Sequence, residues 1–200
     1  NYAKPAWAKF EIEIKYTALI KLTKYADFES YLMYVRTARR QEYRSCSKSN
    51  YSLVSSHDHS LLDQLHEKTF ARQSKTRTNA EIRMATQVAS SAVATGKGEI
   101  VYCLSPEGRI ISGCLFIIDN HIAYYMVGST DPEYRKTGAG TFLILEYIRL
   151  LFSRNIYVVD MIGVNSPNRG DYKLSFDAEL VQYHEAKYTH RESWSDTQSL

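Results

Sequence analysis

The stretch HIAYYMVGSTDPEYRKTGAGTFLILEYIRLLFS, residues 121–153, joins a strand to an apolar helix through a glycine-containing loop. The strand pattern covers 121–127 and the helix pattern covers 141–153. Gly138 and Gly140 let a ligand approach the backbone closely, because neither carries a Cβ that would obstruct it. The helix start adds unpaired N–H groups and the positive end of the helix dipole, and both favour a phosphate.

A pyrophosphate would fit this loop, since two basic side chains stand directly before the glycines. The residues expected to hold it are Arg135, Lys136, Thr137, Gly138, Ala139 and Gly140. A glycine-rich turn that only connects two elements is the alternative, which the spacing alone leaves open.

The residues on both sides of this stretch predict the rest of the sheet. Alternation of period two from Glu99 onward predicts an antiparallel meander of three strands joined by tight turns. The predicted elements are strands at 99–104, 109–118 and 121–128, the helix at 141–153, a strand at 155–164, a short helix at 166–176 and a strand at 178–188. A meander followed by a helical crossover into a further strand predicts a mixed α/β sheet.

The first half of the chain is predicted to form helices that cover the sheet, together with short strands. The expected elements are one or two strands at 10–22, a helix at 26–46, a strand at 51–56, and helices at 61–70 and 79–95. The helix at 26–46 carries an apolar stripe and then a basic end, RTARRQEYR. Gly96 stands where the last of these helices should stop.

Length and composition bound the class of protein. Two hundred residues make one domain or two small lobes, and 44% hydrophobic with 24% charged residues exclude a disordered or fibrous chain. The net charge of +3 does not by itself indicate a nucleic-acid binder. No run of eighteen apolar residues predicts a membrane span. The sixteen tyrosines suit a polar cleft with aromatic walls.

Three cysteines, an odd number without metal-ligand spacing, predict neither a disulfide framework nor a zinc site. They are Cys46, Cys103 and Cys114. A reduced cytoplasm is therefore the expected location. The first residue is not Met, which indicates that a preceding part is missing.

The motif His57-Asp58-His59 contains residue types that bind metal ions, but no further ligand stands at metal-binding spacing. We therefore expect Asp58 to cap a helix, and no metal is predicted.

The order of elements and the motif R-x-x-G-x-G at 135–140 resemble the GNAT (GCN5-related) N-acyltransferases. The pair Asn165 and Tyr172 has the spacing of the late motif of that superfamily. The resemblance implies the GNAT fold and acyl-CoA as co-substrate, either acetyl-CoA or a hydroxyacyl-CoA. It further implies that 135–140 hold the pyrophosphate, that Asn165 lies near the pantetheine arm and that Tyr172 lies near the thioester.

A more specific resemblance, to the FemAB/BioF2-like branch, covers nearly the whole chain. It rests on segments 35–50, 65–73, 121–139 and 158–188. The ending departs from the family pattern, with Ser175 before Phe176 and Asp177 in place of glycine. The branch usually has a preceding GNAT-like lobe, so 1–55 are expected to be its remnant or link, 56–190 the acyltransferase domain and 191–200 a polar tail.

The resemblance implies an N-acyltransferase that moves an acyl group from acyl-CoA to a primary amine. The expected partner is a small-molecule amine acceptor such as a nucleotide-linked amino sugar of cell-surface polysaccharide synthesis, with no DNA partner and with a homodimer left open. One alternative is a Fem-type transferase that takes an amino acid from aminoacyl-tRNA to a peptidoglycan precursor. Another is a non-catalytic GNAT-like binding module, which the departures at Ser175 and Asp177 favour.

The candidate catalytic residues are Asp160, Tyr172 and Lys173. Asp160 ends a strand, where it could take the amine proton or orient the substrate, although a turn-capping carboxylate is the alternative. Tyr172 could protonate the leaving thiolate, or simply be another half-buried tyrosine. Lys173 could bind a phosphate or the developing negative charge, or be a solvated helix lysine. The candidate substrate-binding residues are Arg72, Gln73 and Tyr125.

Overall fold

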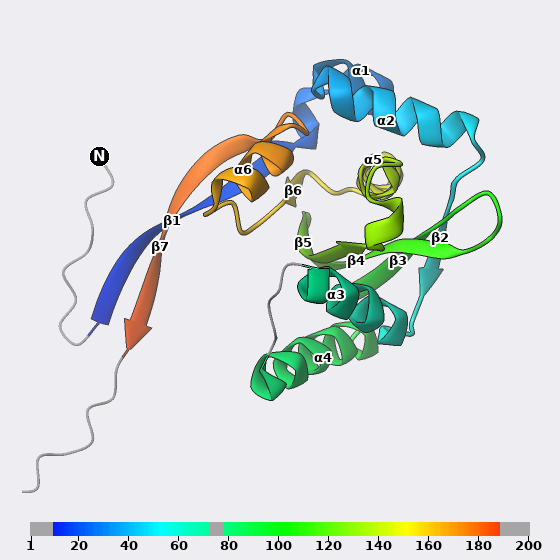
Figure 1. Cartoon of the computed structure of the whole chain (residues 1–200). Helices are drawn as coiled ribbons and strands as arrows, with labels where there is room; N and C mark the ends of the chain where they lie inside the picture. The colour runs from blue at the N-terminus through cyan, green and yellow to red at the C-terminus, as the bar shows by residue number, and fades with distance from the viewer. Residues whose placement is uncertain (1–9, 73–77, 189–200) are drawn as a thin grey trace, which may run out of the picture.

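The computed structural model describes residues 10–72 and 78–188, which form one seven-stranded mixed sheet with helices on both faces (Figure 1). The strands are β1 (Phe10–Lys21), β2 (Ser52–Ser56), β3 (Gly98–Leu104), β4 (Ile110–Asp119), β5 (Ile122–Thr130), β6 (Val158–Asp160) and β7 (Glu179–Tyr188). The helices are η1 (Leu22–Lys24), α1 (Phe28–Tyr34), α2 (Thr37–Lys48), α3 (Ser60–Arg72), α4 (Asn79–Ala94), η2 (Pro132–Tyr134), α5 (Ala139–Leu151) and α6 (Pro167–Leu174).

The strand order is β2-β3-β4-β5-β6-β1-β7. Strands β5 and β6 are parallel, and every other neighbouring pair is antiparallel. The meander β3-β4-β5, the crossover through α5 and the parallel strand β6 confirm the mixed α/β sheet that the sequence predicts.

Both faces of the sheet are buried. Along β3, successive side chains point alternately into two separate hydrophobic cores. Val101 and Cys103 pack into the larger core under α1, α2 and α5. Ile100 and Tyr102 pack into a smaller core against α3 and α4. A strand covered on both faces is apolar at successive positions, which explains the unbroken run IVYCL. Figure 1 shows the two layers of helices on opposite sides of the sheet.

The predicted single helix at 26–46 is two helices, α1 and α2. Asp27 and Ser30 form a capping box at the start of α1. The break falls at Val35 and Arg36, whose ψ angles are both 138°. The Arg36 N–H donates to the Ser175 carbonyl at 3.0 Å, so a tertiary contact takes the backbone group that a continuous helix would use.

The predicted strand at 155–164 is also shorter, because β6 ends at Asp160. The Asp160 carboxylate accepts a hydrogen bond from the Ile162 N–H at 2.8 Å. Ile162 and Gly163 have φ angles of +40° and +43°, a left-handed conformation that cannot continue a strand.

Residues 10–55 contribute to the same sheet and the same core as the rest of the described chain. Strand β1 lies between β6 and β7, and Tyr31 of α1 and Cys46 of α2 belong to the larger core. Beyond its short pairing with β6, β1 continues beside β7 as a two-stranded ribbon that extends away from the helices (Figure 1). The descent of this segment from a preceding lobe stays a prediction.

Cys46, Cys103 and Cys114 are buried free thiols. Burial raises the pKa of Cys46 to about 11 and that of Cys103 to about 12, so both stay protonated at neutral pH. Within the described ranges, no helix is both long and apolar enough to cross a bilayer.

Candidate active site

The parallel strands β5 and β6 stop pairing close to the residues of the candidate site. The two strands pair only from Ile122 with Val158 to Tyr124 with Asp160. On the other side of β5, a register shift between Leu115 and Phe116 of β4 marks a β-bulge. Bulges of this kind redirect the side chains that follow, and here the following residues lead into the glycine loop. The carboxyl ends of β5 and β6 therefore frame the candidate site.

The glycine loop is shaped by contacts within the chain. Gly138 is the N-cap of α5, with φ +86°. A Cβ on Gly138 would lie 2.7 Å from the Cβ of Glu42 in α2, and one on Gly140 would lie 2.8 Å from the Thr130 hydroxyl. Both glycines are thus required by close packing of α5 against α2 and β5, whether or not a ligand binds.

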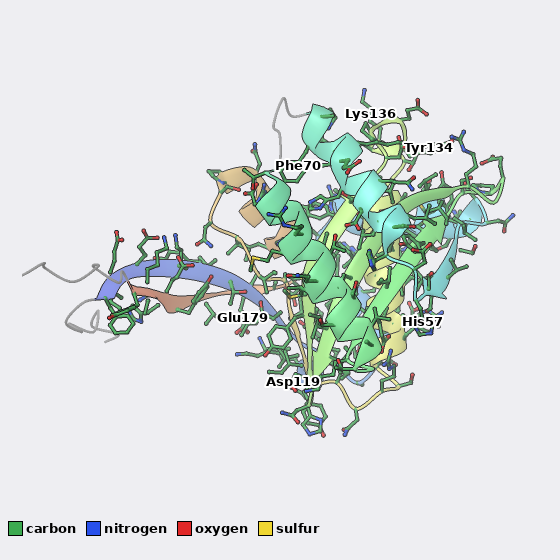
Figure 2. The ribbon with its side chains drawn as sticks, turned by 90° about the horizontal axis from the view of Figure 1, so that it is seen from below. His57, Phe70, Asp119, Tyr134, Lys136 and Glu179 are labelled. Carbon is green, nitrogen blue, oxygen red and sulfur yellow. The ribbon has the colours of Figure 1, made fainter. Side chains whose placement is uncertain are left out.

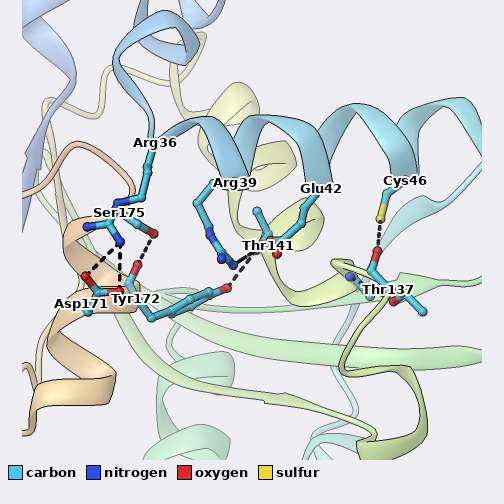
Figure 3. Close-up of polar contacts among 10 residues, drawn as sticks. Arg36, Arg39, Glu42, Cys46, Thr137, Thr141, Asp171, Tyr172 and Ser175 are labelled. Atoms are coloured by element: carbon cyan, nitrogen blue, oxygen red, sulfur yellow. Dashed lines mark hydrogen bonds and ion pairs between the residues drawn. The ribbon is translucent and has the colours of Figure 1, made fainter.

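Helix α2 lies across the start of α5 and reaches α6 (Figure 3). At one end, Arg36 forms an ion pair with Asp171 of α6, with two contacts of 2.9 Å. At the other end, the Cys46 thiol donates to the Thr137 carbonyl at 3.3 Å. Contacts at its two ends therefore fix α2 to α6 and to the loop before α5.

Between these two anchors, a polar cluster joins α2 to α5 and α6. The Thr141 hydroxyl donates to the Glu42 carboxylate at 2.5 Å, and Arg39 pairs with the same carboxylate at 2.7 Å. Arg39 also donates to the Thr141 oxygen at 3.2 Å. Since the single proton of Thr141 is given to Glu42, the Tyr172 phenol is the donor in its 3.3 Å contact with Thr141.

Arg36, Arg39 and Glu42 were not predicted from the sequence as site residues. Their spacing, continued by Cys46, places them on one face of a helix, and that periodicity is the signal that could have singled them out. The segment is rich in basic residues, and a run of charges on a helix usually marks a solvent-exposed face. For that reason the spacing was not interpreted as a functional signal.

Tyr172 lies beside the glycine loop, with its phenol oxygen 3.8 Å from the position of a Cβ on Gly140. Burial raises the pKa of Tyr172 to about 12, against the opposing effects of Thr141 and Arg39. The Arg39 guanidinium lies 5.2 Å from the centre of the Tyr172 ring. A phenol with this pKa stays protonated at neutral pH and can donate its proton.

Lys173 points toward the end of β6. Its ammonium donates to the carbonyls of Met161 at 2.6 Å and Ile162 at 2.8 Å, with a longer contact of 3.5 Å to Gly163. Burial, with a contribution from Arg169, lowers the pKa of Lys173 to about 8, although Asp160 opposes the shift. Lys173 is therefore a partly desolvated ammonium that holds the turn after β6, and not a solvated helix lysine.

Asp160 ends β6 as expected. Its carboxylate accepts hydrogen bonds from the Thr17 hydroxyl of β1 and from the Ile162 N–H. These contacts are those of a turn-capping carboxylate, the alternative that the sequence left open. A role in proton transfer stays a prediction.

Tyr125 of β5 packs between Phe116 and Lys173. Its ring centre lies 5.4 Å from that of Phe116 and 5.5 Å from the Lys173 ammonium. Its hydroxyl lies over Gly128, where a Cβ would come within 1.7 Å. Burial raises the pKa of Tyr125 well above its usual value, so the phenol stays neutral. Tyr125, Tyr172 and Lys173 thus meet near the ends of β5 and β6.

Asn165 contacts the ribbon. Its side-chain oxygen accepts a hydrogen bond from the Tyr16 N–H at 2.8 Å. Asn165 and Tyr16 line an open cavity of about 570 Å³ between the ribbon and α6, together with Ile14, Leu174 and Leu180. Its amide oxygen therefore serves to tie β1 to the loop before α6.

Arg72, at the end of α3, lies beside the basic residues of the loop. Arg72, Arg135 and Lys136 line a second cavity of about 590 Å³ with Pro132 and Glu133. Figure 2 shows Lys136 and Tyr134 at the same end of the molecule as Phe70 of α3. Three cations facing one cavity suit an anionic group. Gln73, the neighbouring candidate, lies outside the described residues.

The residues His57, Asp58 and His59 stand directly before α3. The Asp58 carboxylate accepts from the Ser60 N–H at 2.8 Å, as expected of a capping residue. His59 contacts Asp63 at 3.0 Å and the Ser90 hydroxyl at 2.9 Å. In the part of the chain that is described, no group of three or more His, Cys, Asp or Glu residues is arranged to hold a metal ion.

The start of α5 does not fit the pyrophosphate of acyl-CoA in this conformation. The Glu42 carboxylate already lies at the first turn of α5, and its Cγ would be 3.0 Å from a Cβ on Gly138. A pyrophosphate at the same place would meet a like charge. Arg135 and Lys136, which were expected to assist there, face the cavity with Arg72 instead.

Comparison with known proteins identifies the fold and the family model that the chain matches. Residues 34–174 match the model described as "Acetyltransferase (GNAT) domain". A solved structure of FemX is similar with a TM-score of 0.72 and 10% identity, over 92% of this chain and 64% of that chain. The structure of L-PGS from Bacillus licheniformis is similar with a TM-score of 0.62 and 11% identity, over 92% and 63%.

A third similar structure is a tandem GNAT protein from the clavulanic acid biosynthesis pathway. Its TM-score is 0.50 at 12% identity, over 86% of this chain and 53% of that chain. The chain therefore spans less than two thirds of the length of these structures. At such identities the likeness shows the fold alone. Among curated proteins, none matches the chain.

Proposed function

The chain belongs to the GNAT acetyltransferase family, and on this premise we propose that it transfers an aminoacyl group from an aminoacyl-tRNA to a primary amine. The observation that carries the choice of donor is the cover of the glycine loop by α2, with Glu42 at the first turn of α5. The acyl-transfer chemistry is that of the family, and the ester-linked aminoacyl-tRNA is the alternative donor that the Fem-like resemblance leaves open.

The reaction that fits the site is a direct attack of the amine on an ester carbonyl. The amine nitrogen forms a bond to the carbonyl carbon, and the bond from that carbon to the ribose oxygen breaks. The amine loses one proton to water or to Asp160, and the departing ribose oxygen gains one from Tyr172, whose raised pKa keeps the phenol protonated. Most of the rate would come from holding the two reactants together.

Lys173 is proposed to stabilise the negative charge that develops on the carbonyl oxygen. Two of its hydrogen bonds are short, to Met161 and Ile162, while the 3.5 Å contact to Gly163 is weak enough to exchange for a substrate oxygen. A partly desolvated ammonium acts more strongly there than a solvated one would. Tyr125 would form the floor beside it.

The phosphates of the donor are proposed to bind in the cavity lined by Arg72, Arg135 and Lys136. Arginine pairs well with phosphate oxygens, and the residues that line this cavity come from α3 and from the segment 132–136. The proposed acceptor is an amine carried by a nucleotide-linked peptidoglycan precursor, as the Fem-like resemblance implies.

A transfer assay tests the proposal. Purified protein is mixed with a nucleotide-linked precursor that bears a free amine, and with labelled aminoacyl-tRNA or labelled acetyl-CoA in separate reactions. We expect label to reach the precursor from the tRNA only, and Lys173→Met to abolish that transfer. Label arriving only from acetyl-CoA would refute the proposed donor. The absence of transfer from both donors, to this precursor and to an amino-sugar nucleotide, would refute the enzymatic function.

A second candidate is acyl-CoA-dependent transfer to a nucleotide-linked amino sugar. The motif from Arg135 to Gly140 and the helix that starts directly after it favour this reading. It requires the Glu42 carboxylate of α2 to leave the first turn of α5 before the cofactor can bind. The acetyl-CoA arm of the same assay, run with an amino-sugar nucleotide as acceptor, distinguishes the two candidates.

A two-lobed parent protein is the proposed context of the chain. The ribbon of β1 and β7 exposes Ile14, Tyr16 and Leu180 on its surface, and the cavity beside it is lined by the same residues. A preceding GNAT-like lobe seated there would cover them. We expect a longer form of the protein to protect these residues from chemical labelling.

A further inference from the structure

Helix α5 begins in a way that attracts an anion. Its N-cap is Gly138, which has no side chain to cap the helix, and the Ala139 N–H donates to the Thr137 hydroxyl at 3.3 Å. The first turn of a helix carries a partial positive charge from its unpaired N–H groups. In the described chain, the anion at this place is the Glu42 carboxylate, which binds the Thr141 hydroxyl of that turn.

Glu42 is held there by more than one contact. Arg39, one turn earlier on α2, pairs with the carboxylate at 2.7 Å and also binds the Thr141 hydroxyl. The side chains of Arg39 and Glu42 are 22% and 31% exposed, so their pairing is shielded from water more than an ordinary surface ion pair. Helix α2 is anchored on both sides of this point, through Arg36 to Asp171 and through Cys46 to Thr137.

We propose that Glu42 is a specificity-determining residue: its carboxylate takes the place of a ligand phosphate at the α5 N-terminus and so excludes acyl donors that carry a pyrophosphate. This inference deepens the proposed function, because it concerns which donors the same site admits. It rests on the position of the carboxylate and on the close approach of α2 to Gly138.

Removal of the carboxylate should turn this place into an anion site. Arg39 would lose its partner while remaining tied to Thr141, and the helix dipole would be left without a counter-charge. In Glu42→Ala the Cβ that packs on Gly138 is kept, and alanine is the strongest helix former, so α2 should retain its place. The matched control is Glu29→Ala, which removes one exposed carboxylate from the neighbouring helix α1.

Calorimetric titration with inorganic pyrophosphate, and then with CoA, tests the proposal. We expect Glu42→Ala to bind pyrophosphate at least about tenfold more tightly than the wild type, which corresponds to about 1.4 kcal/mol. Glu29→Ala should match the wild type. Adding Arg39→Ala to Glu42→Ala should remove the gain, because the cation that would hold the anion is gone.

Two results would overturn the proposal. One is wild-type binding of CoA that is as tight as binding by Glu42→Ala. The other is a folded Glu42→Ala, with a circular dichroism spectrum like that of the wild type, that gains no affinity. If Glu42→Ala unfolds, Glu42→Gln keeps the shape without the charge, and the same gain is required of it. Since the readout is binding, a failed transfer assay would refute the proposed reaction and leave this inference standing.

Discussion

The carboxylate of Glu42 accepts a hydrogen bond of 2.5 Å from the hydroxyl of Thr141, which lies 99 residues further along the chain. This contact places a negative charge from α2 at the first turn of α5, where the resemblance to GNAT proteins predicts the pyrophosphate of acyl-CoA. In the proposed function, the contact connects the packing of two helices to the choice of acyl donor.

The Thr141 hydroxyl should matter for stability. In Thr141→Val, Glu42 loses a partner, and the donors of Arg39 and Tyr172 lose an acceptor. We expect a loss of about 1–3 kcal/mol in the free energy of unfolding, measured with urea. Thr23→Val, at an exposed position in η1, is the control and should change it little. An equal effect of both variants would show that the Thr141 contacts contribute nothing.

Substitution of Gly138 should destabilise the protein more than substitution of a glycine that has open space around it. Gly138 and Gly108 have φ angles of +86° and +78°, so alanine at either position is strained by about 1–2 kcal/mol. Only at Gly138 would the new Cβ meet α2, at 2.7 Å. We expect Gly138→Ala to lower the free energy of unfolding by at least about 1 kcal/mol more than Gly108→Ala does. Equal losses would contradict the close seating of α2.

The titration of Lys173 should make stability depend on pH. Its pKa is about 8 in the folded protein and near 10.5 when unfolded, so between these values the unfolded chain binds more protons. The free energy of unfolding of the wild type, relative to Lys173→Met, should therefore rise as pH increases from about 8 to 10.5. A flat difference over this window would show that the ammonium is not desolvated.

We expect the Tyr172 hydroxyl to affect the rate of transfer and to have little effect on folding stability. Tyr172→Phe removes the proton donor but keeps the ring that packs against Phe176. We expect transfer to slow by between about a hundredfold and ten-thousandfold, as for loss of a general acid. The control, Tyr157→Phe, alters an exposed phenol that stacks on His121. Unchanged transfer by Tyr172→Phe would remove this residue from the mechanism.

Much of the fold followed from local pattern. The apolar strands joined by tight turns from Glu99 onward and the apolar helix after the glycines predicted the meander and crossover, because burial on the sheet imposes such runs. The break at Val35 was not predictable, since it depends on the distant carbonyl of Ser175. Tertiary contacts of this kind override helix propensity.

The candidate site was predictable in part. Tyr172 was singled out by its spacing from Asn165 and Lys173 by the family resemblance, whereas the helix that covers the loop was not predicted. Glu42 meets its partners only after the chain has folded, and no local pattern in the sequence shows which element will pack on Gly138. The sequence singled out the glycines for ligand binding, and the structure gives them a packing role that spacing could not distinguish from it.

Hydrogen–deuterium exchange of the wild-type chain, with and without millimolar CoA, tests the central claim most directly. The claim is that α2 stays on the first turn of α5 and closes it to this cofactor. We expect peptides from 37–48 and 135–141 to be protected equally in both conditions. Loss of protection in 37–48, together with a gain in 135–141 when CoA is added, would show that the helix gives way to the cofactor and would contradict the account.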